Sequence, residues 1–188
     1  MKKALLYTLG AWAFAFTLQS CNKLKDAIPA QDVSFTASTD ITIAAATDTT
    51  QQITLGQASI SYNIDSMIKA QTDQKLGYSN IQTIKINSIK LSLTDANATN
   101  NFANFVNAMA SFNSSANSTL YTIANIQSNP DSYSDILSPS VVSTSDDVKS
   151  YFNSQMTLNY ILAGKLRRAT TQTLHCHIEV TYTINVKA

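Results

Sequence analysis

The residues best suited to chemistry lie near the C-terminus, where His175, His177 and Glu179 alternate with apolar residues. Side chains of a β-strand alternate between its two faces, so these three share one face. Residues two apart lie about 6.6 Å apart along a strand, a gap that a zinc ion bound by two imidazoles could bridge. Two interpretations follow: a metal site with Glu179 as third ligand, or three polar side chains on the solvated face of a sheet. We favour the second, because a catalytic metal site also needs an open coordination position.

Cys176 lies between the two histidines and points to the opposite, apolar face of the same strand. A nucleophilic cysteine needs a base beside it, and both histidines point away. We therefore predict that Cys176 is a small buried side chain without a chemical role.

Other catalytic patterns are missing from the sequence. It contains neither a glycine-rich phosphate loop, nor a Gly-x-Ser-x-Gly elbow, nor a Cys-x-x-Cys pair. Lys165, Arg167 and Arg168 form a small basic cluster that could meet lipid headgroups or an acidic partner, or simply be a solvated turn. The formal net charge is only +1, without the basic excess that nucleic acid attracts. We expect no enzymatic activity, no cofactor and no nucleic-acid partner.

The N-terminus predicts export. Lys2 and Lys3 precede an apolar run over residues 4–16, which indicates a secretory signal peptide and is too short for a membrane span of about 20 residues. The sequence Leu18-Gln19-Ser20-Cys21 resembles the lipobox of bacterial lipoproteins. That resemblance implies a signal peptide over residues 1–20 and acylation of Cys21, whose acyl chains would bind membrane lipid. An ordinary signal peptide with a chance cysteine is the alternative.

We predict that residues 21–31 form a lipidated tether, because they are polar and show no sustained hydrophobic period. Asn22 stands where an inner-membrane retention signal would have aspartate, which favours the outer membrane. The sequence leaves open whether the protein faces the periplasm or the exterior.

The elements that carry these residues are mostly strands. Alternation predicts a final strand from Thr170 to Val186, whose apolar face consists of Leu174, Cys176, Ile178, Val180, Tyr182, Ile184 and Val186. The same period predicts strands over residues 32–46, 53–64, 81–94, 106–113, 120–126 and 156–162. Gly56 and the pair Asn87-Ser88 are predicted bulges, the second because the apolar phase reverses there.

Helical spacing predicts two short helices. One runs from Ile64 to about Asp73 with Asn63 or Asp65 as its cap, and the other covers residues 146–152 with Ser145 as its cap. A helical turn is expected at residues 102–105 and a hairpin turn at residues 164–168. About seven strands joined by loops predict one domain over residues 32–188: an all-β, antiparallel β-sandwich, immunoglobulin-like in general architecture.

The order of these segments resembles small, generally uncharacterised outer-membrane lipoproteins of Bacteroidota. The lipobox, the strand block 84–93, the sequence 101–105, the segment ending at Phe152 and the long C-terminal strand carry the resemblance. It implies no catalytic residues. Asp48-Thr49-Thr50 and Asp65-Ser66-Met67 look like the short O-glycosylation signal of that phylum.

The sequence thus predicts a membrane-anchored envelope lipoprotein that acts as a non-enzymatic binding or structural module. Its expected partners are membrane lipid, through acylated Cys21, and an envelope protein or glycan. The alternative is a metal-binding module or metal-dependent enzyme that uses His175 and His177.

Overall fold

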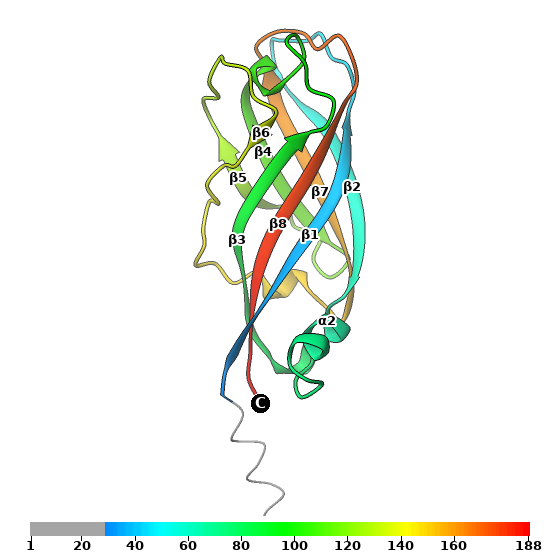
Figure 1. Ribbon diagram of the computed structural model, residues 1–188, viewed down its shortest axis with the longest axis vertical. Coiled ribbons are helices and arrows are strands. Elements are labelled where there is room, and N and C mark those ends of the chain that lie inside the picture. The colour runs from blue at the N-terminus through cyan, green and yellow to red at the C-terminus, as the bar shows by residue number, and fades with distance from the viewer. Residues whose placement is uncertain (1–28) are drawn as a thin grey trace, which may run out of the picture.

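Two four-stranded antiparallel sheets pack face to face in the computed structural model, which describes residues 29–188 (Figure 1). The predicted signal peptide over residues 1–20, Cys21 and most of the predicted tether over residues 21–31 lie outside the described residues. The strands are β1 (Gln31–Ile43), β2 (Gln52–Asn63), β3 (Ile81–Leu93), β4 (Phe105–Ser114), β5 (Tyr121–Ile126), β6 (Ile136–Leu137), β7 (Gln155–Leu166) and β8 (Leu174–Val186).

The strand order is that of a jelly roll. Sheet A has the order β1-β8-β3-β6 and sheet B the order β2-β7-β4-β5, and every connection except β4–β5 crosses between the sheets. Jelly rolls are double sheets of eight antiparallel strands, whereas an immunoglobulin sandwich divides seven strands into sheets ABED and CFG. The predicted all-β antiparallel sandwich is confirmed, with eight strands instead of about seven. The additional strand, β6, has only two residues and no alternation to detect.

β8 lies at the centre of sheet A and pairs with β1 on one side and β3 on the other. Its predicted alternation is confirmed, because all seven apolar side chains are at most 1% exposed. The strand begins at Leu174, however, and not at Thr170. Thr170 instead binds the loop after β1: its N–H donates to the carbonyl of Ala46, and its hydroxyl accepts from the Ala46 N–H. β1 likewise ends at Ile43, short of the predicted Ala46.

Both predicted bulges are present. The β2–β7 register shifts between Thr54 and Gly56, and the β3–β8 register shifts between Ile86 and Ser88. The second shift returns Ile89 and the apolar residues after it to the buried face. Glycine is required at position 56, because a Cβ atom there would lie 2.5 Å from the Thr42 carbonyl oxygen of the neighbouring sheet.

The predicted hairpin turn at residues 164–168 is wrong. Gly164 pairs with Ala108 and Leu166 with Phe105 on β4. Pairing with β4 therefore continues β7 past the glycine to Leu166, which is 1% exposed. A Cβ atom at Gly164 would lie 2.7 Å from the Asn107 carbonyl oxygen, so this glycine permits close strand approach and does not form a turn.

The predicted helix over residues 146–152 is also wrong, and only the 3-10 turn η4 (Lys149–Tyr151) forms there. The Ser145 hydroxyl contacts Ser143 and caps no helix. Asp147 instead accepts hydrogen bonds from the N–H groups of Ile84 and Lys149, which fix this segment against β3.

The first predicted helix is confirmed as α2 (Ile64–Gln71), with Asn63 as its cap. It ends before Asp73, which adopts a positive φ of 50° together with Gln74 at 63°. Two further 3-10 turns are η2 (Tyr78–Asn80) and η3 (Phe102–Asn104), the second at the predicted helical turn. No helix among residues 29–188 is long and apolar enough to cross a membrane.

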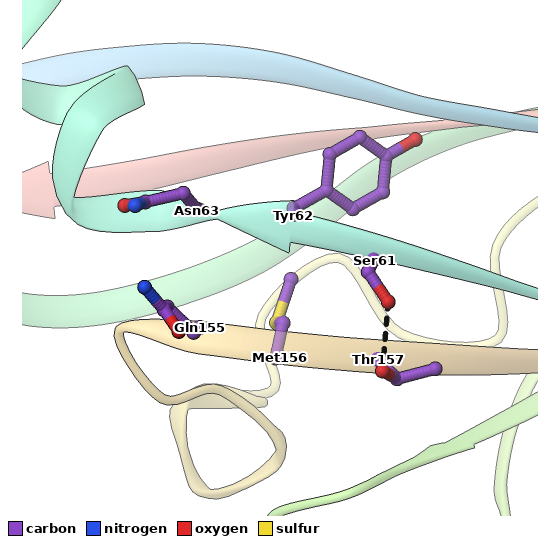
Figure 2. A pocket seen from close by; sticks show the side chains of 6 residues that line it. All are labelled: Ser61, Tyr62, Asn63, Gln155, Met156 and Thr157. Atoms are coloured by element: carbon purple, nitrogen blue, oxygen red, sulfur yellow. Dashed lines mark hydrogen bonds between the residues drawn. The ribbon is translucent and has the colours of Figure 1, made fainter.

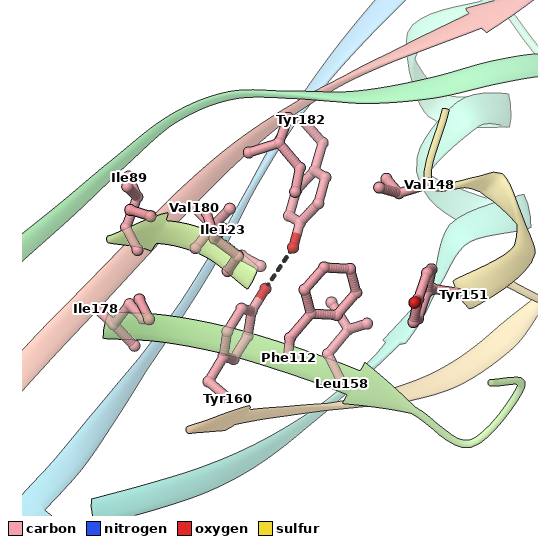
Figure 3. Packing of buried hydrophobic residues seen from close by; sticks show 14 of the residues in the cluster. Ile89, Phe112, Ile123, Val148, Tyr151, Leu158, Tyr160, Ile178, Val180 and Tyr182 are labelled. Carbon is pink, nitrogen blue, oxygen red and sulfur yellow. Dashed lines mark hydrogen bonds between the residues drawn. The ribbon is translucent and has the colours of Figure 1, made fainter. Parts of the chain in front are cut away.

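A buried polar contact lies in the core between the two sheets. The hydroxyls of Tyr160 on β7 and Tyr182 on β8 lie 2.9 Å apart and join the two sheets (Figure 3). Burial raises the pKa of both tyrosines, so both stay protonated at neutral pH. The Tyr182 ring also stacks on Phe35 with a centroid distance of 5.0 Å and meets Phe152 edge-on.

The two faces of β8 should respond differently to charge. Val180→Asp places a carboxylate at a fully buried position and should prevent folding, because an unpaired buried charge costs several kcal/mol. Thr181→Asp, one residue away on the solvated face, should change stability by less than about 1 kcal/mol. Thermal unfolding of both variants measures the difference, and equal tolerance would contradict the packing of this strand.

The tyrosine pair should show strong coupling. Tyr160→Phe or Tyr182→Phe alone leaves one buried hydroxyl without its partner and should destabilise the protein by about 1–3 kcal/mol. The double variant removes both hydroxyls and should be close to wild type. Urea unfolding of the four proteins tests this, and additive losses would show that the hydroxyls do not interact.

Candidate functional site

The three predicted metal ligands share the outer face of sheet A, as expected, but each contacts a different partner. His177 Nδ1 lies 2.7 Å from Asp40 on β1, whereas Glu179 forms a 3.4 Å ion pair with Lys90 on β3. His175 Nδ1 lies 2.9 Å from Asp95, just beyond the end of β3. The two imidazoles therefore bind carboxylates on opposite sides of β8.

Asp95 is the best-bound carboxylate of this face. It also accepts the backbone N–H of His175 at 3.0 Å. Desolvation raises its pKa, but the hydrogen bonds from the His175 backbone and ring, with the charge of that ring, outweigh it and leave the pKa below its ordinary value. Asp95 thereby fastens the start of the β3–β4 connection to β8.

Within residues 29–188, no three histidine, cysteine or acidic side chains come together in a way that could hold a metal ion. A carboxylate bonded to Nδ1 is common where the other ring nitrogen binds a metal. Here, however, the two carboxylates lie on opposite sides of β8. The zinc site at His175, His177 and Glu179 stays a prediction from the sequence.

Cys176 is fully buried, as its place in the alternation indicates. Desolvation raises the pKa of its thiol to about 12. The thiolate, which is the reactive form, is therefore scarce at neutral pH.

The predicted basic cluster is divided by the structure. Lys165 belongs to β7, and its N–H donates to the Asn107 side chain. Arg167 turns inward and donates to the carbonyls of Ala103 and Asn129 at 2.7 and 2.5 Å. Arg168 pairs with Asp131 at 2.6 Å. The two arginines therefore anchor the β5–β6 connection and do not form a free cationic patch.

These arginines belong to one end of the sandwich, which we call the loop end: connections 44–51, 94–104, 127–135 and 167–173 (Figure 1). Asparagine side chains join two of these connections, 94–104 and 167–173. Asn100 accepts the Thr171 N–H at 2.7 Å, and Asn104, which is fully buried, donates to the Ala169 carbonyl at 3.0 Å. The available sequence signal was the group of asparagines at residues 97–104.

The two glycosylation-like sequences are solvent-accessible. Thr49 is exposed in the β1–β2 connection, and Ser66 is exposed in the first turn of α2. Asp48 accepts hydrogen bonds from the side chain and backbone of Thr50 and from Gln51, which lower its pKa. Modification of either sequence stays a prediction.

Sequence reasoning missed a solvent-open hollow of about 420 Å³, which lies where β2 ends and β7 begins (Figure 2). This is the end of the sandwich opposite to the loop end, and we call it the tether end because the predicted tether precedes β1 there. Its lining consists of Ser61, Tyr62, Asn63, Gln155, Met156 and Thr157. The available signal was the row of hydroxyl and amide side chains at alternate positions of these two strands. Such rows normally indicate only a solvated sheet face.

A ladder of side-chain hydrogen bonds leads away from the hollow across sheet B. Ser61 and Thr157 lie 2.8 Å apart, and Ser59 donates to Asn159 at 2.7 Å. Asn159 donates in turn to Asn113 on β4 at 2.9 Å. Hydroxyls and amides thus line the part of the outer face of sheet B that lies next to the hollow.

Comparisons with known proteins add little to this geometry. No protein-family model and no curated protein matches the chain. Among solved structures, the VP2 subviral particle of infectious bursal disease virus has a TM-score of 0.38 at 9% identity, over 84% of this chain and 33% of that one. The capsid of Helicobacter pylori bacteriophage KHP30 has a TM-score of 0.34 at 10% identity, over 85% of this chain and 100% of that one.

A third similar structure is the decameric BFDV capsid protein, with a TM-score of 0.37 at 10% identity, over 85% of this chain and 100% of that one. The chain spans about a third of the length of the VP2 chain. Likeness at these TM-scores carries no argument about function. The jelly-roll assignment rests on the strand order.

The Cys176 thiol should resist alkylation while the protein is folded. At mildly alkaline pH the peptide that carries Cys176 should stay unlabelled by iodoacetamide, because burial holds the thiol protonated and out of reach. Unfolding in guanidinium chloride should lead to full labelling. Mass spectrometry of that peptide provides the measurement, and rapid labelling of the native protein would contradict the burial.

Proposed function

We propose that this protein is a lipid-anchored lipoprotein of the outer membrane that binds an envelope partner and does not catalyse a reaction. The lipobox-like sequence at Cys21 supplies the anchor in this proposal. The observation that carries it is the polarity of the fold: β1 begins at one end of the sandwich, and the four connections of the loop end lie at the other (Figure 1).

This polarity suits display from a membrane. From Cys21 to Gln31 the chain can extend at most about 35 Å, so an acylated Cys21 would keep the tether end close to the lipid. The loop end would then point away from the membrane. Three of its connections are joined by Asn100, Asn104 and Arg167, and such preorganisation lowers the entropic cost of binding a partner.

Binding is favoured over catalysis by the state of the reactive groups. His175, His177 and Glu179 each pair with an oppositely charged or hydrogen-bonding neighbour. Cys176, the one cysteine among the described residues, is buried with a raised pKa. The hydrogen-bonded ladder on sheet B offers hydroxyls and amides, which recognise partners by hydrogen bonds.

Acylation is tested by growing bacteria that express the chain with radiolabelled palmitate. We expect the wild-type protein to incorporate label and to fractionate with the outer membrane, whereas Cys21→Ala should be unlabelled and released. Cys176→Ala is the matched control and should keep the label, because the buried cysteine takes no part in acylation. An unlabelled wild-type protein would instead indicate an ordinary signal peptide.

A further inference from the structure

The hollow at the tether end is built from residues that face each other across two strands. Asn63 on β2 is the register partner of Gln155 on β7, and Ser61 is the partner of Thr157 (Figure 2). Asn63 and Gln155 are both exposed. Two amides and two hydroxyls therefore point to the same side of the strand pair, beside α2.

Much of the hydrogen-bonding capacity of these groups is unused. Asn63 Oδ1 accepts the N–H of Ser66 at 2.9 Å and caps α2, but no partner within the described residues contacts its Nδ2. The Gln155 amide makes no hydrogen bond to the described residues. Of the Ser61 and Thr157 hydroxyls, which lie 2.8 Å apart, one keeps its own hydrogen, because each hydroxyl has a single donor.

The residues that line the hollow carry no charge. None of its six lining residues is ionisable at neutral pH, and the nearest charged pair on α2, Asp65 with Lys69, is joined at 2.6 Å. An anionic or cationic ligand would leave its hydration shell without gaining a counter-charge, which is unfavourable. A neutral ligand that both donates and accepts hydrogen bonds along its length would match these amides and hydroxyls.

The shape selects among neutral ligands. A volume of about 420 Å³ falls in the usual range of small-molecule sites, but such sites enclose most of their ligand. This hollow is open, and the ladder Ser59–Asn159–Asn113 continues from it across sheet B. An extended chain lying over the surface fits better than an enclosed small molecule.

We infer that this hollow binds a neutral polysaccharide, with the side-chain amides of Asn63 and Gln155 hydrogen-bonded to the hydroxyls of one or a few sugar units. The inference rests on the proposed binding function and specifies its partner as a glycan near the tether end.

The test uses the full chain, purified in a detergent that lacks a sugar headgroup, with glycan binding measured by isothermal titration calorimetry. The probes are the neutral hexasaccharides of α-1,4-glucose, β-1,4-glucose, β-1,4-mannose and β-1,4-N-acetylglucosamine, and hexagalacturonate as an acidic probe. We expect saturable binding of at least one neutral hexasaccharide and none of hexagalacturonate.

Variants locate the site. Asn63→Asp keeps the oxygen that caps α2 and removes the Nδ2 donor, and Gln155→Ala removes the facing amide. The double variant should lose at least tenfold in affinity without a change in melting temperature. Gln52→Ala is the matched control: Gln52 is exposed on β2 at its other end, opposite Lys165, and its loss should leave affinity unchanged.

Three results would overturn the inference: no neutral hexasaccharide binds, the double variant binds as well as wild type, or hexagalacturonate binds more tightly than the neutral probes. The same titration on Cys21→Ala separates the two proposals, because sugar binding does not need the acyl chains. Absence of sugar binding leaves membrane anchoring intact, and absence of palmitate label leaves the sugar site intact.

Discussion

The structure depends on the insertion of the last strand, β8, between β1 and β3. Its backbone is hydrogen-bonded on both edges, and one face buries seven apolar side chains against sheet B. A slip of one residue would move that entire face into water, so the register of sheet A is strongly specified. Because β8 lies between strands from the first half of the chain, sheet A cannot be completed until the rest of the sequence is in place.

The link between the two sheets depends on the same strand. Tyr182 extends from β8 into the core and meets the hydroxyl of Tyr160 from β7 (Figure 3). Aromatic rings from Phe35, Phe112 and Phe152 surround this pair. This contact favours the observed alignment of the sheets, because either hydroxyl without the other would be buried without a partner.

The outer surfaces divide into groups that are already paired and groups that are not. On sheet A the histidines and Glu179 are paired with their neighbours, and at the loop end the arginines bind backbone carbonyls and Asp131. The amides of Asn63 and Gln155 are different, because they line a hollow and their N–H groups have no partner among residues 29–188. The candidate for recognition is therefore the neutral hollow, whereas His175, His177, Glu179 and the two arginines already contact neighbouring residues.

Elements with a local signal could be located from the sequence. Alternation located β8 and β3, the phase reversal located the bulge at Ser88, and Asn63, one of two predicted caps, marked the start of α2, because side-chain period and caps act over a few residues. Four features became visible only in the folded chain: Gly164 lies in a strand, Asp147 binds β3 and does not begin a helix, Arg167 turns inward, and Asn63 faces Gln155. Each of these depends on a partner more than 20 residues away in the chain, and side-chain pattern along one segment carries no information about which distant segment packs against it.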